Sequence, residues 1–285
     1  MRGCAKIAGL LGCAFLVSHF ALAQTPKGPL KILRPLVSQS EDGSPLEGGE
    51  SFLPGEQVYF SFQVENYKIS DTGKVQITGH TQAFDPKGTA IAAKDEEVIG
   101  TSVSQEDKSW KPKLRSQIQI PSIAPPGAYR IQYEVTDLQT HQTAEGWATF
   151  PVHGKGVESS PELVIRDLGF YRTQDETNAL RLAAYRAGDL LWVRFNVTGY
   201  KYGEQNSIDV AYDVTVLKSD GTQLFTQEDA AVERSQAFYP QPWIPAEFNL
   251  SLQNTMSAGT YTLVITARDG SGHQTATARA EFHVE

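Results

Sequence analysis

Hydrophobic residues recur at every second position in several short runs of the chain. The clearest runs are Val58, Phe60, Phe62 and Val64, and later Leu191, Val193, Phe195 and Val197. Successive side chains of a β-strand point to opposite faces of a sheet, so this alternation is typical of strands that bury one face and expose the other. Turn-forming sequences such as Asp-Pro-Lys-Gly (85–88) and Asp-Gly-Ser-Gly (269–272) separate the runs. The chain is therefore predicted to be all-β, with antiparallel sheets.

The alternating runs and turn signals predict strands in the first half of the chain at about residues 30–37, 56–65, 73–84, 89–99, 114–121, 128–137 and 144–152. The second half is predicted to contain strands at the corresponding positions. Only residues 176–186 have helix-like spacing, and there we expect a variable connection with room for one helical turn. Short strands at this spacing, about seven per half, favour an immunoglobulin-like β-sandwich.

The two halves are copies of one unit. Adding 133 to the residue number carries Gly55 to Gly188, Tyr67 to Tyr200, Gly88 to Gly221, Trp110 to Trp243 and Pro112 to Pro245. Adding 132 carries Gly127 to Gly259, Tyr129 to Tyr261, Asp137 to Asp269, His141 to His273 and Phe150 to Phe282. We infer that the second copy lost one residue between the positions of Pro112 and Gly127. Two copies make a tandem repeat rather than a solenoid.

The predicted organisation follows from the repeat and from changes in composition. Residues 1–23 are a signal peptide, 24–29 an N-terminal tail, 30–152 the first domain, 153–162 a linker rich in Gly, Ser and Pro, and 163–285 the second domain. The Gly and Pro residues of the linker allow hinge motion between the domains.

In both copies, a tyrosine near the start of the sixth predicted strand belongs to a motif that resembles one in known domains. Pro-Gly-Ala-Tyr (126–129) and Ala-Gly-Thr-Tyr (258–261) resemble the tyrosine corner of immunoglobulin-like and fibronectin-type domains. Ile131 and Leu263 stand where antibody domains have a cysteine. The chain is similar to tandem bacterial immunoglobulin-like β-sandwich repeat proteins of unknown function. This resemblance implies two tandem immunoglobulin-like sandwiches, and a fold of this kind does not imply a function.

The N-terminus has the parts of a secretory signal. Arg2 and Lys6 precede an apolar run that ends in Ala-Leu-Ala (21–23), a typical cleavage site. We expect cleavage before Gln24 and export to the bacterial periplasm or beyond, with no membrane span afterwards. A retained anchor is the alternative, although the apolar run is short for a span. Lipoprotein anchoring at Cys13 is the other alternative, but that cysteine comes too early in the run.

Charge and cysteine content exclude several classes of function. The chain has a net charge of -8, and removal of Arg2 and Lys6 leaves 23 basic against 33 acidic residues, or -10. An acidic protein lacks the basic surface that nucleic acids and anionic membranes require. Both cysteines, Cys4 and Cys13, fall in the signal peptide. The mature chain therefore has no thiol for catalysis or for a zinc site.

No catalytic motif is present in the mature chain. Its histidines have no metal-binding spacing, and there is no nucleophile elbow or phosphate-binding glycine loop. His141 and His273 follow Asp137 and Asp269 by four residues. Such a pair could bind a metal or transfer a proton, but its place in a hairpin tip favours a role in holding the turn. The acidic clusters at 95–97, 106–107 and 228–229 lack the ligand spacing of a calcium loop. We expect neither an enzyme nor a bound metal or cofactor.

The strongest candidate for a binding surface is the loop before the fifth strand of the second domain. Residues 237–243 read Ala-Phe-Tyr-Pro-Gln-Pro-Trp, whereas the corresponding residues 105–110 are polar before Trp110. Exposed aromatic side chains on a proline-rich loop either fold back on their own domain or meet a partner. Tyr200 and His273 belong to loops at the same end of the predicted sandwich. The candidate binding residues are Phe238, Tyr239, Trp243, Tyr200 and His273.

The sequence thus favours an exported, non-catalytic interaction or structural module of the cell envelope that binds a protein partner through end loops of the second domain. One alternative is a carbohydrate-binding module, which would require Trp110 and Trp243 to be flat and exposed. Another is a protease-inhibitor-like protein, which would require the 237–243 loop to protrude. A glycan therefore remains a possible partner, and the oligomeric state stays open.

Overall fold

The computed structural model describes residues 28–285 except 105 and 108. The predicted signal peptide, with Cys13, and residues 24–27 of the predicted tail lie outside the described residues. The first repeat forms β1 (Lys31–Ser38), β2 (Gln57–Glu65), β3 (Lys74–Phe84), β4 (Asp95–Ser102), β5 (Lys113–Gln119), β6 (Gly127–Asp137) and β7 (Thr143–Val152). A three-stranded sheet β1-β2-β5 faces a four-stranded sheet β4-β3-β6-β7. The rings of Phe60 on β2 and Tyr133 on β6 join the two sheets, with their centroids 5.1 Å apart.

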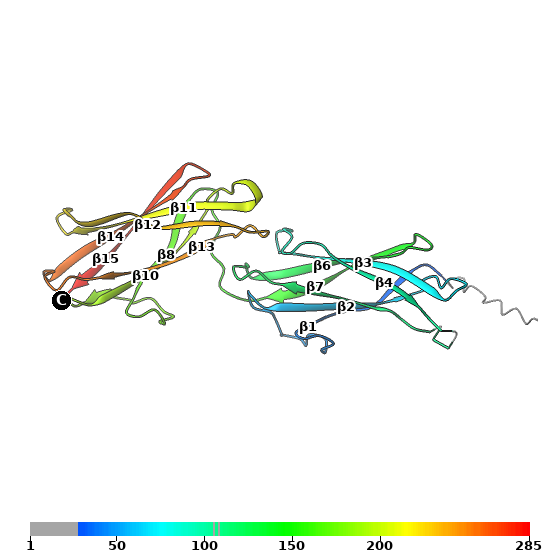
Figure 1. Ribbon diagram of the computed structural model, residues 1–285. Helices are drawn as coiled ribbons and strands as arrows, with labels where there is room; N and C mark the ends of the chain where they lie inside the picture. Colours follow the sequence, from blue (N-terminus) through cyan, green and yellow to red (C-terminus); the bar gives the residue numbers. More distant parts are fainter. Residues whose placement is uncertain (1–27, 105, 108) are drawn as a thin grey trace, which may run out of the picture.

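The second repeat has the same arrangement with one more strand. Its elements are β8 (Val164–Tyr171), β9 (Ala184–Tyr185), β10 (Leu190–Thr198), the 3-10 helix η1 (Glu204–Asn206), β11 (Ser207–Lys218), β12 (Gln223–Gln236), β13 (Ile244–Ser251), β14 (Gly259–Asp269) and β15 (Gln274–Val284). The sheets are β13-β10-β8 and β12-β11-β14-β15-β9. All pairs of named strands are antiparallel except β15 with β9. The two sandwiches lie end to end in an elongated molecule (Figure 1).

The alternation seen in the sequence builds the two cores. The inward residues of β2 (Val58, Phe60, Phe62 and Val64) and of β10 (Leu191, Val193, Phe195 and Val197) are at most 3% exposed. Their polar neighbours along each strand point to the other face of the sheet. The prediction of an all-β fold with two antiparallel sandwiches is confirmed.

The tyrosine predicted to form a corner does so in both repeats. The Tyr129 hydroxyl donates a hydrogen bond to the Pro125 carbonyl at 2.8 Å, and Tyr261 donates to the Ser257 carbonyl at 2.9 Å. Each bond spans four residues and fixes the loop before the strand that carries the tyrosine. Burial raises the pKa of Tyr129, so the hydroxyl keeps its proton at neutral pH.

The two cores fill one position in opposite ways. Gly79 leaves room that the side chain of Leu114 occupies: a Cβ built on Gly79 would lie 2.1 Å from Leu114 Cδ2. The corresponding residues of the second repeat are Tyr212 and Ala246, a large residue on the sheet that has glycine in the first repeat. Tyr212 packs edge-on against Phe195, with their centroids 5.5 Å apart. The two repeats thus have the same backbone arrangement, but the large side chain that fills this part of the core comes from opposite sheets.

Residues 176–186 do not form the helical turn that their spacing allowed. The chain bends there and ends in β9, which pairs with the last residues of β15. Tyr185 is 2% exposed, and its hydroxyl donates to the Tyr171 carbonyl at 2.9 Å. In the first repeat Phe52 makes the corresponding contact, a single parallel bridge to Val152. Strand pairing and burial of these aromatic residues outweigh the weak helical preference of the segment.

The residue lost from the second repeat lies earlier than the sequence match indicated. Phe62 pairs with Leu114 in the first sandwich, and Phe195 pairs with Ala246 in the second. The offset is therefore already 132 at Leu114, and the loss falls before this strand rather than after Pro112. The repeated Trp-x-Pro pattern is consequently not equivalent in space: Trp110 is 37% exposed, whereas Trp243 is 9% exposed.

The fourth strand of the first repeat also differs from expectation. It begins at Asp95 rather than near residue 89. The preceding residues turn inward, where the Ile91 N–H donates to the Ala83 carbonyl at 2.9 Å and the Ile91 side chain is 4% exposed. In the second repeat β12 begins at Gln223 and continues without this inward turn.

Candidate functional site

The hairpin between the last two strands of each repeat is held by a buried aspartate. Asp137 is 1% exposed, and its carboxylate accepts hydrogen bonds from the Gln139 N–H at 2.9 Å and the Thr140 hydroxyl at 2.9 Å. It also accepts the Lys68 N–H at 2.8 Å, which ties the loop after β2 to the hairpin. Asp269 repeats this contact with the Lys201 N–H at 2.8 Å. The aspartates therefore act as structural acceptors.

The neighbouring histidines have a backbone role in the same turn. His141 and His273 adopt φ angles of 57° and 53°, in the left-handed region, and both side chains are exposed. The following glutamines bind the start of each repeat: the Leu30 N–H donates to Gln142 and the Leu163 N–H to Gln274, both at 2.9 Å. The repeated Asp-x-x-x-His-Gln sequence thus joins three segments at one end of each sandwich.

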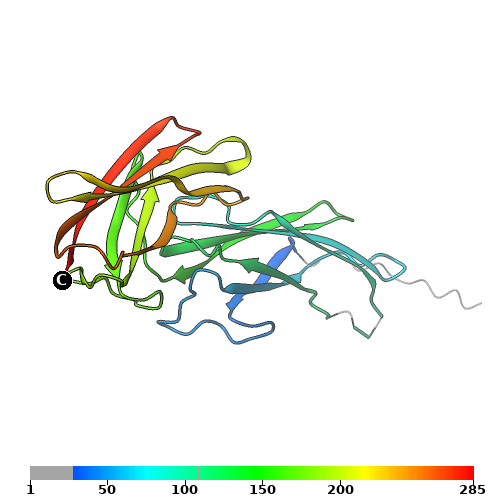
Figure 2. The ribbon, with the colours of Figure 1, turned by 60° about the vertical axis from the view of Figure 1, so that its left-hand side comes forward.

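The aromatic loop of the second repeat contacts the first sandwich. Tyr239 is 6% exposed and belongs to the hydrophobic core cluster of the first repeat. Its hydroxyl donates to the Asp85 carboxylate at 3.0 Å, across 154 residues of sequence. Figure 2 shows the connection between β12 and β13 reaching the end of the first sandwich. The sequence predicted that these aromatic side chains either fold back on their own domain or meet a partner. Tyr239 does neither, because it is buried against the other repeat.

Backbone N–H groups of the turn that contains Asp85 hold its carboxylate in place for this contact. It is 3% exposed, and its carboxylate also accepts the Lys87 N–H at 2.9 Å and the Thr89 N–H at 2.8 Å. Burial, and then the charge of Asp85, raise the pKa of Tyr239, so the hydroxyl stays protonated and donates. The repeat places Lys218 at the position of Asp85, so the second sandwich has no carboxylate there. Among the described residues the pair therefore occurs once, and it joins the repeats in one order.

The other predicted binding residues are divided between the interior and the surface. Trp243 and Tyr200 are buried at 9% and 6% exposure, and the Tyr200 hydroxyl donates to the Gln241 carbonyl. Phe238 is 57% exposed, and His273 is also exposed. The five residues predicted from sequence thus share one end of the second sandwich, but only Phe238 and His273 present their side chains to solvent.

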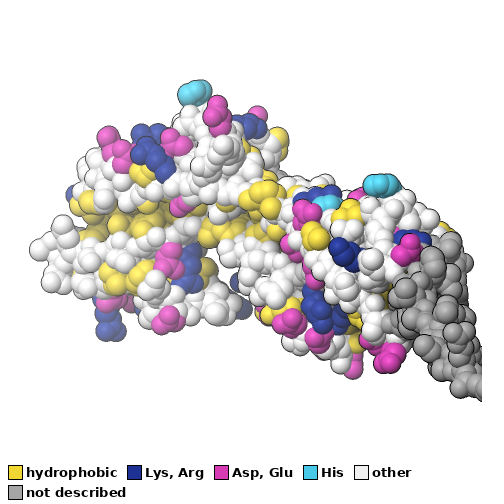
Figure 3. All heavy atoms as spheres, turned by 45° about the vertical axis from the view of Figure 1, so that its right-hand side comes forward, with side chains coloured by type: hydrophobic (Ala, Val, Ile, Leu, Met, Phe, Trp, Pro, Cys, Tyr) yellow, Lys and Arg dark blue, Asp and Glu magenta, His cyan; other side chains and the backbone are white. Residues whose placement is uncertain are grey.

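An apolar groove that the sequence did not predict lies between β12 and β13, two edge strands of the second sandwich. It encloses about 290 Å³. Its apolar lining comes from Val216, Leu224, Phe225, Leu250, Leu252 and Met256. Leu224 and Phe225 are 41% and 40% exposed. In Figure 3 a band of hydrophobic side chains crosses the second sandwich between its two layers. We refer to this feature as the β12–β13 groove.

The first sandwich closes the equivalent place with its own side chains. Ile91 corresponds to Leu224 but points inward, and Ile118, which corresponds to Leu250, is 3% exposed. The difference arises because the connection after β3 turns toward the core, whereas β12 pairs with β11 from Gln223 onward. The replacement of Ile91-Ala92 by Leu224-Phe225 was the only trace of this difference in the sequence, and it does not by itself reveal exposure.

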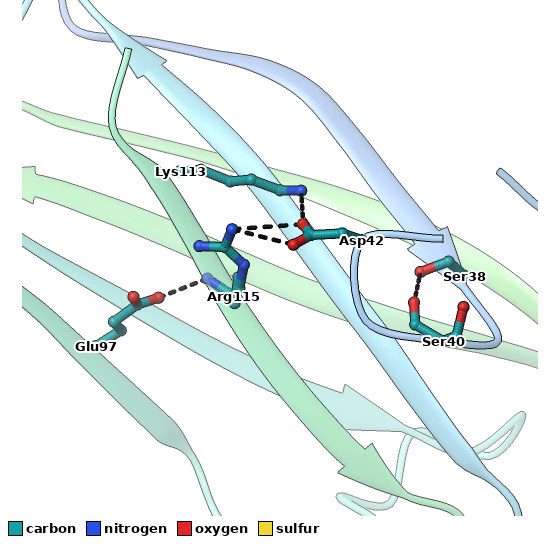
Figure 4. A network of polar contacts seen from close by, with 6 residues as sticks. All are labelled: Ser38, Ser40, Asp42, Glu97, Lys113 and Arg115. Carbon is teal, nitrogen blue, oxygen red and sulfur yellow. Dashed lines mark hydrogen bonds and ion pairs between the residues drawn. The ribbon is translucent and has the colours of Figure 1, made fainter. Parts of the chain in front are cut away.

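Polar side chains also close the edge of β5 in the first sandwich (Figure 4). The Glu97 carboxylate accepts the Arg115 backbone N–H at 2.5 Å, and Asp42 forms ion pairs with Lys113 and with Arg115. Ser38 donates to the Ser40 carbonyl at 2.9 Å and holds the loop that carries Asp42. The second repeat has Ala230 at the position of Glu97. Its corresponding edge strand, β13, therefore lacks this carboxylate cap.

Within the part of the chain that the structure describes, no helix is long and apolar enough to cross a membrane. The same residues contain no group of three or more His, Cys, Asp or Glu side chains that could hold a metal ion.

Comparisons with known proteins give limited information. No family model matches the sequence, and no curated protein matches it. One similar solved structure is the Pseudomonas fluorescens alkylpurine DNA glycosylase AlkC bound to DNA containing an abasic site analog, with 12% identity and a TM-score of 0.29. That match covers 44% of this chain and 30% of the glycosylase chain.

Another is the C-terminal domain of the Streptococcus pyogenes antigen I/II-family protein AspA, with 10% identity and a TM-score of 0.30. It covers 88% of this chain and 99% of that domain. Neither similarity bears on function at these values.

Proposed function

We propose that the protein is an exported, non-catalytic interaction module of the bacterial cell envelope that binds a protein partner through its second sandwich. The observation that carries this proposal is the β12–β13 groove. The first sandwich fills the same place with Ile91, so the fold does not require it to be open. Apolar surface that one copy buries and the other exposes is typical of an interaction site.

The cost of this exposure supports the same conclusion. Complete burial of a Leu or Phe side chain stabilises a protein by about 1.5–3 kcal/mol. Leu224 and Phe225 are about two-fifths exposed, so roughly 1 kcal/mol per side chain is left unrealised in the isolated chain. A partner that covers the groove recovers this free energy. Phe238, which is 57% exposed, adds one further exposed aromatic ring at the other end of the same sandwich.

We propose further that both repeats are bacterial immunoglobulin-like modules. The sandwiches, with three strands facing four in the first repeat and five in the second, and the two tyrosine corners support this assignment. The Tyr239–Asp85 contact supports a role for the first sandwich as a fixed spacer that presents the second.

Capture of partners from the protein's own cell-envelope fraction tests the proposed function. Residues 24–285 serve as bait, beside a variant with Leu224→Ser and Phe225→Ser. The matched control changes two leucines elsewhere on the second repeat that are at least as exposed, Leu182→Ser and Leu190→Ser, at 64% and 41% exposure. We expect the groove variant to lose a partner that the control retains. Capture that survives the groove variant would remove the groove from the proposed function.

A second candidate function is glycan binding, and one observation favours it. Trp147 on β7 is 52% exposed, and the Arg130 guanidinium lies 5.3 Å from its ring centroid. An exposed indole on a sheet face can stack on a sugar ring. The burial of Trp243 removes it from such a platform, and the burial of Tyr239 keeps the 237–243 loop from protruding as an inhibitor loop would. Titration with envelope polysaccharides, with Trp147→Ala as the variant, should show fluorescence quenching only in the unmodified chain if this function is correct.

A further inference from the structure

We infer that the second sandwich binds an extended segment of its partner as an added β-strand along the free edge of β13, with apolar side chains of that segment in the β12–β13 groove. This inference rests on the proposed function and specifies the chemistry of the partner. The occupant is a stretch of polypeptide with apolar side chains at alternate positions. It is neither a folded surface nor a small molecule.

The backbone of β13 offers the hydrogen-bonding groups for such a strand. One side of β13 pairs with β10, and its other side is the edge of the sheet. Just after β13, the Leu252 N–H donates to the carbonyl of Asp189, the residue before β10, at 2.9 Å. Because backbone groups alternate along a strand, the N–H groups of Glu247, Asn249 and Ser251 face away from β10. Arg115, the counterpart of Glu247, shows this direction by donating its N–H to Glu97.

The inner face of β13 is incompletely covered. On β5 the inward residues Ser116 and Ile118 are 6% and 3% exposed. Their counterparts Phe248 and Leu250 are only partly buried. The missing cover lies beside the strand edge, where an added strand would place every second side chain. Immunoglobulin constant-type domains have a fourth strand at this place in the corresponding sheet.

The equivalent place in the first sandwich indicates which side chains of a partner would fit the β12–β13 groove. In the first sandwich a branched aliphatic residue, Ile91, belongs to the same closed core cluster as Ile118. The groove volume of about 290 Å³ is at the lower limit of pockets that enclose small organic ligands, and the groove is partly open to solvent. An open groove beside a free strand edge suits strand addition, in which backbone bonds give affinity and alternate pockets give specificity.

The other edge of the groove is less suitable for pairing. The register of β12 with β11 shifts between Tyr212 and Val214, and Asp229 adopts a φ of 45° within this bulge. Glu228 and Asp229 add negative charge at the same point. Bulges and charges on an edge strand oppose pairing with another chain. The β13 edge has Pro245 at its start, and each outward-facing residue after it has a backbone N–H.

The test uses a random library of nine-residue peptides displayed on phage and selected on residues 24–285. Four proteins are compared: the unmodified chain, Phe225→Ser, Asn249→Pro and the matched control Gln117→Pro. Gln117 occupies the position of Asn249 in the first sandwich. Proline at an outward-facing position removes one edge donor and crowds an added strand, while the bonds to β10 remain. Pro245 already stands at an equivalent outward position.

We expect the selected peptides to alternate apolar and polar residues. Their binding should fall about tenfold or more with Phe225→Ser and with Asn249→Pro, and should be unchanged with Gln117→Pro. Thermal unfolding of each variant checks that the fold is intact, and Ser251→Pro replaces Asn249→Pro if that protein does not fold.

Two results would overturn the inference. Selected peptides without alternation would do so, as would binding that Asn249→Pro leaves intact. If capture of a partner from the envelope depends on Phe225 but not on the Asn249 amide, the proposed function stands and strand addition fails. If neither variant affects capture, the proposed function fails as well.

Discussion

At the scale of single residues, the two repeats provide internal controls for each other. Tyr129 and Tyr261 make the same bond from the same position, although the loops before them differ in sequence. Such agreement identifies the hydroxyl, rather than the ring alone, as the feature that both copies keep.

Removal of that hydroxyl should therefore destabilise the repeat that contains it. We expect Tyr129→Phe to lower the free energy of unfolding of the first sandwich by about 1 kcal/mol, because the Pro125 carbonyl loses its buried donor. Urea unfolding measures the change. Tyr59→Phe, at a partly exposed tyrosine of β2, is the control and should have a smaller effect. Equal effects of the two variants would contradict a structural role for the corner.

The complementary pair Gly79 and Leu114 allows a double-mutant cycle. Leu114→Ala should cost about 2–5 kcal/mol because a cavity remains beside Gly79. Gly79→Tyr should also destabilise the first sandwich, because Leu114 already fills the space. The double variant recreates the pair found in the second repeat, Tyr212 and Ala246. We expect it to be less destabilised than the sum of the single variants by about 0.5–3 kcal/mol in urea unfolding, and simple additivity would refute the complementarity.

At the scale of elements, substitutions can distinguish a backbone role of the hairpin-tip histidines from a role of their imidazole side chains. His141 and His273 are in the left-handed region, which costs a residue with a side chain roughly 1 kcal/mol and costs glycine little. We expect His141→Gly to leave the melting temperature unchanged or to raise it, whereas His141→Val should lower it. Differential scanning fluorimetry makes the comparison. A fall in melting temperature with glycine would show that the imidazole itself stabilises the turn.

The strands could be predicted from sequence because the signal is local. Alternation at Val58–Val64 or Leu191–Val197 depends only on neighbours along the strand, and the observed bounds differ from the predicted ones by a few residues at most in nearly every strand. The corner tyrosines were also recognisable, because the loop and the bond lie within four residues.

The groove and the contact between repeats could not be predicted in this way. Whether Ile91 points inward and Leu224 outward is decided by how each connection packs on a distant strand, and the alternation is similar in both. Tyr239 was predicted as a binding residue on an exposed aromatic loop, but it is 6% exposed and packs against the first repeat. Its partner Asp85 lies in the other repeat, and no local pattern connects them.

At the scale of the whole molecule, the order of the two sandwiches is specified by one buried pair. The elongated arrangement in Figure 1 depends on a contact whose two members have no counterparts in the other repeat. This asymmetry makes the two sandwiches unequal partners in the contact. It also predicts that changes at Tyr239 alter the shape of the molecule more than its secondary structure.

Tyr239→Ala should loosen the arrangement of the two sandwiches. The substitution removes a buried ring from the core cluster of the first repeat and leaves Asp85 without its hydroxyl donor. Small-angle X-ray scattering should show a broader distribution of intramolecular distances, while circular dichroism stays the same. Phe238→Ala, at the exposed neighbouring residue, is the matched control and should leave the scattering profile unchanged. An unchanged profile for Tyr239→Ala would mean that the linker, and not this contact, sets the arrangement.

The same contact should respond to high pH. A free tyrosine has a pKa of about 10, and burial beside Asp85 raises that of Tyr239 above this value. The folded contact therefore favours the protonated hydroxyl, so its full contribution is present below about pH 10 and is lost as the pH rises further. Other buried tyrosines, such as Tyr67 and Tyr185, have a pKa raised to about 12 and weaken their own repeats in the same direction.

Comparison of the unmodified chain with Tyr239→Phe isolates the contribution of the contact. Phenylalanine keeps the buried ring but has no proton to lose and no charge to place beside Asp85. Scattering recorded between pH 7 and about pH 11 should therefore show the unmodified chain opening at a lower pH than Tyr239→Phe, provided that circular dichroism shows both sandwiches still folded. If the two proteins open together, ionisation elsewhere controls the arrangement and the Tyr239–Asp85 pair is not its pH-sensitive element.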